Sequence, residues 1–158
     1  MGAAMKTTED KTPAAEGVFY SVVVPAYNEQ DSVNLFYERA RSTMDSMGKP
    51  WEIIFVNDGS ADGTLDALRV LAKKDNRVKY VSLSRNFGHQ AALTAGLAHA
   101  SGMAIISIDC DLQDPPELIP QLCGKWQEGF DIVYARRSNY RRDSLIKRYA
   151  SMAYYFVL

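Results

Sequence analysis

The sequence lacks three features that define large classes of protein. Its 18 Lys and Arg residues nearly balance its 19 Asp and Glu residues, and a net charge of -1 gives no overall positive field, so we expect no nucleic-acid partner. Its two cysteines, Cys110 and Cys123, have no disulfide-framework or metal-ligand spacing, which favours reduced thiols in a cytosolic setting. No run of about eighteen apolar residues is present to span a bilayer.

What is present is the composition of one globular domain. The chain has 158 residues, of which 47% are hydrophobic, and this is enough to bury a single core. Residues 1–17 are small, charged and without periodicity, and they lack the apolar centre of a signal peptide, so we interpret them as a flexible leader. We expect the core to occupy residues 18–135 and a distinct segment to follow over residues 136–158.

Short apolar runs alternate with longer helical patterns along the core. Several runs, such as SVVV and EIIFV, are apolar at consecutive positions, which is typical of parallel strands covered by helices on both faces. The predicted strands are residues 18–24, 52–57, 78–84, 104–109 and 131–135, and the predicted helices are residues 30–46, 62–74, 89–100 and 115–127. This order predicts an α/β fold, Rossmann-like, with a mostly parallel sheet and helices on both faces.

Polar or acidic loops follow four of the predicted strands. In an open parallel sheet, ligands bind outside the carboxyl ends of the strands, so these loops should gather at one site. The loops are PAYNE at residues 25–29, NDGS at 57–60, SRNFGHQ at 84–90 and DCDLQDPPE at 109–117.

Asp109 and Asp111 form the sharpest chemical signal. Two carboxylates at the end of a buried strand repel each other unless a cation lies between them. Carboxylate oxygens, few in number, suit Mg²⁺ or Mn²⁺, which keep open positions for phosphate oxygens. The alternative is that both acids are solvated loop residues, since a short D-x-D pattern is a weak signal by itself.

Other residues near the strand ends have a functional and a structural interpretation. Asp58 could accept hydrogen bonds from a base or ribose edge, or it could form an Asx turn before Gly59. Gly88 permits an unusual backbone angle before the next helix. His89 and His99 have no second metal ligand at useful spacing, so we interpret both as boundary or surface residues. Cys110 should pack beneath its loop.

Three acidic residues are assigned to helix capping. We expect Asp114 to be an N-cap, with Pro115 in the first turn and Glu117 completing a capping box. Asp62, which precedes Gly63, is the predicted N-cap of the helix over residues 62–74.

Residues 136–158 differ from the core in charge and pattern. Six basic residues and one acidic residue, Asp143, give this segment a net charge of +5. Apolar residues recur at helical spacing, and basic residues cluster in the first part of the expected helix, at Arg141, Arg142, Lys147 and Arg148. This pattern is typical of an amphipathic helix at a membrane interface. The alternative is a helix packed on its own domain. The segment ends on YYFVL without a polar cap, so we expect the chain to be truncated.

Four ordered motifs, VVVPAYNE, FVNDGS, LSRNFGHQAALTAGLAHASG and IDCDLQDPPELIP, together resemble the family-2 glycosyltransferases of the GT-A fold, and specifically their polyprenyl-phosphate branch. The resemblance implies a nucleotide diphosphate sugar as donor, with UDP as the nucleotide and glucose or a related hexose as the sugar. It implies Mg²⁺ or Mn²⁺ at Asp109, Asp111 and Gln113, and catalysis by Asp109, Asp111 and Arg137. The implied nucleotide-binding residues are Pro25, Ala26, Tyr27, Glu29, Asp58, Gln90 and Asp109.

The same resemblance implies the acceptor and the location. The implied acceptor is a polyprenyl phosphate, undecaprenyl or dolichyl, and the implied reaction inverts the anomeric centre of the sugar. The implied location is the anionic surface of a membrane, on its cytoplasmic face, and the implied process is cell-envelope glycan synthesis. Relatives continue with an acceptor-side segment that this sequence does not contain. A nucleotide-sugar-binding or membrane-docking fragment without turnover is therefore the alternative function, and a phospho-receiver domain with an acidic pocket is a third.

Overall fold

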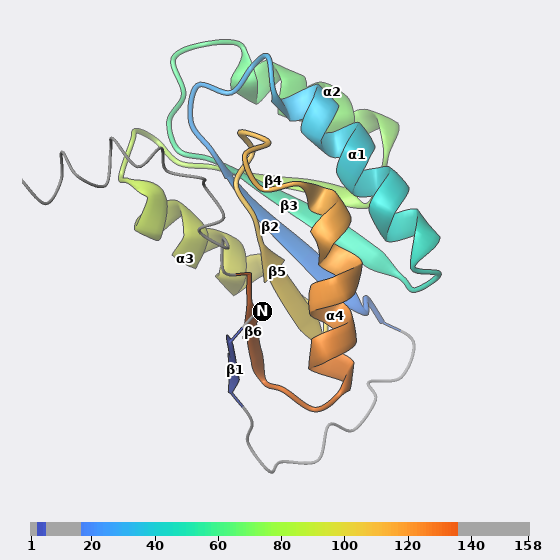
Figure 1. Cartoon of the computed structure of the whole chain (residues 1–158). Coiled ribbons are helices and arrows are strands. Elements are labelled where there is room, and N and C mark those ends of the chain that lie inside the picture. The colour runs from blue at the N-terminus through green and yellow to red at the C-terminus, as the bar shows by residue number, and fades with distance from the viewer. Residues whose placement is uncertain (1–2, 6–16, 136–158) are drawn as a thin grey trace, which may run out of the picture.

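A computed structural model of the chain describes residues 3–5 and 17–135 (Figure 1). Strands and helices alternate along the chain after the first strand. The strands are β1 (Ala3–Met5), β2 (Tyr20–Ala26), β3 (Trp51–Asn57), β4 (Val78–Ser82), β5 (Ala104–Ser107) and β6 (Ile132–Tyr134). The helices are α1 (Val33–Ser46), α2 (Thr64–Lys74), α3 (His89–His99) and α4 (Ile119–Gln127), the last preceded by the 3-10 turn η1 (Pro116–Leu118).

The core is a four-stranded sheet in the order β4-β3-β2-β5, and all its pairings are parallel. The central strands β2 and β3 are buried at every position, which is why both are apolar at consecutive residues. Tyr20 pairs with Trp51 and with Ala104, so the three strands start level and their carboxyl ends meet at one edge. The predicted α/β fold with a parallel sheet is confirmed.

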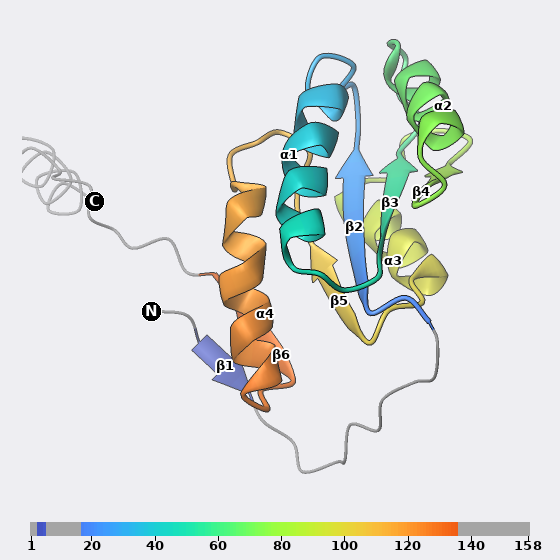
Figure 2. The ribbon, with the colours of Figure 1, turned by 90° about the vertical axis from the view of Figure 1, so that its right-hand side faces the viewer.

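Helices cover both faces of this sheet (Figures 1 and 2). On one face, alternate residues of β2 and β3 pack against α1, α2 and α4 in a single apolar cluster. Phe36 of α1 and Phe55 of β3 meet edge to face there, with ring centroids 6.1 Å apart. On the other face α3 lies against β2 and β3.

Helix α3 approaches the sheet closely because small residues face it. Ala92 and Gly96 are its buried residues. A Cβ at Gly96 would lie only 2.3 Å from Val23 Cγ1 and 3.0 Å from Val56 Cγ2. The distance between helix and sheet is therefore set by the absence of a side chain at position 96.

A buried carboxylate, Glu52, joins neighbouring elements near the amino-terminal ends of the strands. Glu52 is 2% exposed, and its Oε1 atom accepts hydrogen bonds from Ser21 Oγ at 2.6 Å and from Ser101 N and Oγ at 2.8 and 2.7 Å. Its Oε2 atom lies 2.5 Å from Lys79 Nζ. Burial alone raises the pKa of Glu52, but the Lys79 ammonium and the serine hydrogen bonds outweigh it and lower the pKa to about 2.

The last predicted strand of the core, residues 131–135, does not join the parallel sheet. It forms the short strand β6, which pairs antiparallel with β1, so that Met5 lies opposite Ile132. The prediction of a leader without regular structure over residues 1–17 was therefore wrong for Ala3–Met5. An apolar run three residues long fixes neither the partner nor the direction of pairing.

Strand ends also shift by a few residues. The strands predicted over residues 18–24, 78–84 and 104–109 become Tyr20–Ala26, Val78–Ser82 and Ala104–Ser107. Pro25 and Ala26 consequently belong to β2 and not to the loop that follows it. Among residues 3–5 and 17–135, no helix is both long and apolar enough to cross a bilayer.

The predicted helix caps were wrong in detail. Gly63 is the N-cap of α2, and the Asp62 carboxylate one residue earlier accepts the Thr64 N–H at 2.9 Å. Glu117 closes no capping box at η1, whose N-cap is Pro115. Glu117 instead accepts two hydrogen bonds from Arg39 of α1, at 2.8 and 2.7 Å. Asp62 thus contacts the start of its own helix, whereas Glu117 binds a side chain of another helix.

Replacing Gly96 with alanine is expected to destabilise the fold by about 1–3 kcal/mol, because the new methyl group overlaps buried valine side chains. Gly124→Ala in α4 is the matched control: its Cβ meets nothing within 4 Å, so helix propensity should stabilise the chain by about 0.5–1 kcal/mol. Urea unfolding measures both, and equal effects of the two substitutions would contradict this packing.

Stability should depend on the charge of Glu52. Its folded pKa of about 2 lies below the ordinary glutamate value of 4.5, so its contribution to stability is complete above pH 4.5 and disappears as the pH falls toward 2. At pH 7 the wild type should exceed Glu52→Gln by up to about 3 kcal/mol in free energy of unfolding. Unfolding curves between pH 2.5 and 7 should show this gap closing on acidification, and a constant gap would refute the assignment.

Candidate functional site

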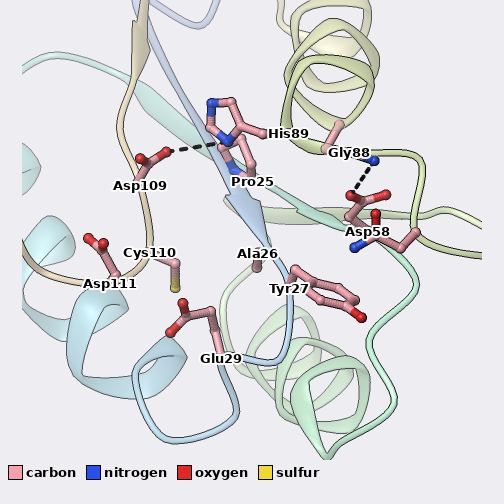
Figure 3. A pocket seen from close by; sticks show the side chains of 12 residues that line it. Pro25, Ala26, Tyr27, Glu29, Asp58, Gly88, His89, Asp109, Cys110 and Asp111 are labelled. Carbon is pink, nitrogen blue, oxygen red and sulfur yellow. Dashed lines mark hydrogen bonds and ion pairs between the residues drawn. The ribbon is translucent and has the colours of Figure 1, made fainter. Parts of the chain in front are cut away.

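An open cavity lies where the parallel strands end (Figure 3). Its volume is about 270 Å³, close to the lower end of ligand pockets, which begin at about 300 Å³. The lining residues come from the end of β2, from the loops that follow β2, β3, β4 and β5, and from the start of α3: Pro25, Ala26, Tyr27, Glu29, Asp58, Asn86, Gly88, His89, Ala92, Asp109, Cys110 and Asp111. The predicted gathering of the strand-end loops is therefore observed.

The four residues predicted from PAYNE all line this cavity. Pro25 and Ala26 are buried at the end of β2, whereas Tyr27 is 47% exposed beside the opening. The Glu29 backbone N–H donates to Thr64 Oγ1 at 2.8 Å, which anchors the loop to the start of α2. This wall thus combines apolar contact with an exposed ring and a carboxylate.

The loop after β2 is joined to the loop after β3 by reciprocal hydrogen bonds. Asn28 N donates to Ser60 Oγ at 3.0 Å, and Ala61 N donates to Asn28 Oδ1 at 2.9 Å. Gln30 N donates to Asp62 Oδ2 at 3.2 Å. Asn28 holds a positive φ of 56°, a conformation that asparagine tolerates better than most residues. These contacts fix the cavity wall before any ligand arrives.

Asp58 is placed in the wall of the cavity but is only 3% exposed. Its Oδ1 accepts the Phe87 N–H at 2.8 Å, and its Oδ2 accepts the Gly88 N–H at 2.9 Å. These two hydrogen bonds join Asp58 to another loop, which differs from an Asx turn before Gly59. Its predicted contact with a base stays a prediction.

Asp109 and Asp111 both face the cavity from the loop after β5 (Figure 3). The Asp109 side chain is 52% exposed. Asp111 Oδ1 accepts the Gln113 N–H at 3.0 Å. Leu112, which lies between Asp111 and Gln113, has a positive φ of 62°. Such a conformation costs a leucine on the order of 1 kcal/mol, and strain of this kind concentrates at functional loops.

Cys110 lies beneath these two acids, as predicted, and is 1% exposed. Burial, reinforced by the carboxylates of Glu29 and Asp111, raises the pKa of the Cys110 thiol to about 12. The thiol is thus held neutral at physiological pH, which makes it a packing residue and not a nucleophile or a thiolate ligand.

The two acids suit a cation that shares its coordination with phosphate. Among residues 3–5 and 17–135 no cluster of three or more His, Cys, Asp or Glu side chains forms a complete metal site. Mg²⁺ and Mn²⁺ do not need one, because one or two carboxylates, water and substrate phosphates commonly complete their shell. Asp109 and Asp111, exposed on the same cavity, fit that mode of binding.

Two of the predicted site residues do not line the cavity, and a third lies beyond the described residues. Gln113 is exposed, and its backbone N–H, not its amide, reaches Asp111. Gln90 lies in the first turn of α3 but is not among the lining residues. Arg137 falls outside the described part of the chain, as does the predicted amphipathic helix over residues 136–158. Their roles stay predictions.

Two lining residues, Asn86 and His89, were missed by sequence reasoning. His89 begins α3 and directs its ring across the cavity, with Nδ1 3.8 Å from Asp109 Oδ1 (Figure 3). The sequence shows no second metal ligand at useful spacing from His89, and this favoured a boundary or surface position for it. The available signal was its position directly after Gly88, at the start of a helix that follows a parallel strand.

Comparison with known proteins is consistent with this geometry. Residues 21–157 match the family model described as "Glycosyl transferase family 2". A bactoprenol glucosyl transferase of Shigella phage SfV is 46% identical to this chain, and the match covers 85% of this chain and 44% of the phage protein. An undecaprenyl-phosphate 4-deoxy-4-formamido-L-arabinose transferase of Salmonella paratyphi B is 44% identical over 83% of this chain and 40% of its own. The chain thus spans less than half the length of these relatives.

A solved structure shares the fold. Glucosyl-3-phosphoglycerate synthase from Mycobacterium tuberculosis, determined with Mn²⁺, uridine diphosphate and phosphoglyceric acid, superposes with a TM-score of 0.57 at 27% identity. The match covers 72% of this chain and 40% of that one.

Proposed function

The chain belongs to glycosyl transferase family 2, and from that premise we propose that its cavity binds the nucleotide diphosphate of a sugar donor in an enzyme that glycosylates a polyprenyl phosphate. One observation supports the proposal most strongly. Asp109, Asp111 and the end of β2 line the same cavity, at the carboxyl ends of the parallel strands. Its GT-A-like fold places ligands at that edge.

The donor is proposed to be UDP-linked, with glucose or a related hexose. Support comes from the uridine diphosphate in the mycobacterial structure and from the bactoprenol glucosyl transferase among the relatives. The exposed ring of Tyr27 offers a face for the base, while Pro25 and Ala26 close the floor beneath it. The diphosphate then extends toward the two aspartates.

The metal is proposed to be Mg²⁺ or Mn²⁺, held by Asp109 and Asp111. When bound, such an ion neutralises the charge that develops on a departing diphosphate. The protein's own contribution is to hold two carboxylates on one strained loop, so that the diphosphate is fixed in a single position. Mn²⁺ in the mycobacterial structure supports this choice of cofactor.

The acceptor is proposed to be a polyprenyl phosphate, undecaprenyl or dolichyl, and the relatives named for bactoprenol and undecaprenyl phosphate support a polyprenyl acceptor. Its phosphate has a second pKa of about 6, so it is largely ionised at neutral pH and needs little help from a base. One phosphate oxygen forms the new bond to the anomeric carbon, and the bond to the nucleotide diphosphate breaks with its electron pair leaving on UDP. A single displacement of this kind inverts the anomeric centre.

Arg137 is proposed to stabilise the departing diphosphate, and the basic segment that contains it to lie at an anionic membrane surface on the cytoplasmic side. That surface would bring the lipid phosphate to the cavity. A chain that binds donor and membrane without turnover is the alternative function.

Donor binding should depend on Asp111 and on metal. We expect UDP-glucose to raise the melting temperature of the wild type in Mn²⁺ but not in EDTA, since only ligands that bind the native state stabilise it. Asp111→Asn should lower the affinity for Mn²⁺ and UDP-glucose at least about tenfold, the effect of losing a charged interaction of about 1.4 kcal/mol.

The matched control is Asp66→Asn on α2, whose side chain is 82% exposed and pairs with Arg69. It should bind the donor like the wild type. Metal-independent binding of UDP-glucose would contradict the role of Asp109 and Asp111. Transfer of radiolabelled glucose to undecaprenyl phosphate then separates an enzyme from a chain that only binds.

Vesicle binding should follow lipid charge. Each basic residue near an anionic surface contributes about 1 kcal/mol, so the wild type should sediment with phosphatidylglycerol vesicles and not with phosphatidylcholine vesicles. Replacing Arg141, Arg142, Lys147 and Arg148 with glutamine should abolish this binding, as should high salt. Equal binding to both lipids, or to neither, would defeat the proposal of an electrostatic anchor.

A further inference from the structure

Burial alternates residue by residue beyond the end of β5, in the loop that carries the two proposed metal ligands. Asp109, Asp111 and Gln113 are exposed. Cys110 is buried, and Leu112 is partly buried against the apolar core cluster. A period of two directs successive side chains to opposite sides of an extended chain. The two carboxylates therefore share a side because the residues that alternate with them pack inward.

The backbone departs from an extended conformation at Leu112. Its φ of 62° lies in the left-handed region, where the Cβ of an L-residue crowds a carbonyl oxygen. Within residues 3–5 and 17–135, Asn28 is the one other residue besides glycines with a positive φ, and asparagine adopts this region more readily than most residues. The leucine side chain has no polar atom that could offset the cost by a local hydrogen bond. Its conformation must therefore be held by packing.

The core supplies that packing. Leu112 packs against the apolar cluster to which Cys110 and Ile119 of α4 belong. A change to negative φ would reorient the leucine side chain and withdraw it from this cluster. It would also rotate Asp111 relative to Gln113, whose N–H donates to Asp111 Oδ1 at 3.0 Å. The burial of the leucine and the direction of the Asp111 carboxylate are thus coupled through one backbone angle.

We propose that Leu112 is a positioning residue for the metal site: its packing holds the left-handed backbone that presents Asp111 on the same side as Asp109. The leucine side chain carries no ligand atom, so its effect on a metal passes through the backbone. A loop that is ordered beforehand avoids the entropy cost of being ordered at the moment of binding. The inference rests on the proposed function, because it concerns the carboxylates to which metal binding is assigned there.

The test separates packing from backbone conformation with two substitutions. Leu112→Ala removes most of the packed side chain but keeps a residue that disfavours a positive φ. Leu112→Asn also removes the apolar packing, but asparagine tolerates a positive φ. Met47→Ala is the matched control, because Met47 is likewise partly buried against the core cluster but lies after α1 and does not line the cavity. Circular dichroism checks that each variant is folded.

The first measurement is made by NMR without metal. A positive φ brings the amide hydrogen of a residue close to its own Hα, which gives a strong NOE between these two hydrogens. We expect this NOE at residue 112 to be strong in the wild type, in Leu112→Asn and in Met47→Ala, and to weaken in Leu112→Ala. A weak NOE in the wild type would overturn the inference. So would a strong NOE in Leu112→Ala, because the angle would then not depend on the packed side chain.

The second measurement is Mn²⁺ binding, followed through the EPR signal of free Mn²⁺ with and without UDP. Leu112→Ala should bind Mn²⁺ about tenfold more weakly than the wild type, because a left-handed conformation costs an ordinary residue enough to shift a conformational equilibrium about tenfold. Leu112→Asn should stay within about threefold of the wild type, and Met47→Ala should match it. Asparagine restores the backbone preference and not the apolar packing, so this order identifies the backbone angle as the cause.

The remaining outcomes distinguish a failure of the inference from a failure of the proposed function. Equal affinities in the two Leu112 variants would overturn the inference. So would a loss in Met47→Ala as large as that in Leu112→Ala, because core packing in general would then explain both. A wild type that binds neither Mn²⁺ nor UDP with Mn²⁺ contradicts the proposed function, whereas the metal-free NOE still reports whether packing holds the loop.

Discussion

The level parallel pairing of β2 with β3 and β5 is the constraint on which the site depends. Because these strands start in register and run in one direction, three loops that are far apart in sequence meet at one edge. Helices on both faces of the sheet bury β2 and β3, so neither strand can carry a charge that lacks a partner. Chemistry is thereby confined to the edges, where strands end and side chains reach water.

The two edges of the sheet use polar groups for different purposes. At the amino-terminal edge, Glu52 gathers hydrogen bonds from β2 and the segment after α3 and an ion pair from β4, and this network joins elements without leaving space for a ligand. At the carboxyl-terminal edge, hydrogen bonds between loops leave a cavity open. A rigid wall lowers the entropy lost on binding, because the loops are ordered before a ligand arrives.

Sequence reasoning succeeded where periodicity and topology decide the outcome. The parallel sheet, its covering helices and the gathering of PAYNE, Asp58, Asp109 and Asp111 follow from apolar runs and from the rule that ligands bind at carboxyl strand ends. It failed where a partner comes from a distant part of the chain. Glu117 binds Arg39 and not its own helix, and β6 pairs with Ala3–Met5, because local preferences of about 1 kcal/mol yield to tertiary contacts.

Asp58 shows why residue type alone could not divide the acids of this edge into structural and functional groups. Asp58 and Asp109 both follow apolar strands and both line the cavity, yet the first is buried with two backbone donors and the second is half exposed. Two peptide N–H groups stabilise the buried charge of Asp58, whereas exposed carboxylates on one loop repel each other and gain from a cation. The carboxylates therefore differ in their contacts: Asp58 binds the loop before α3, whereas Asp109 and Asp111 are exposed at the cavity.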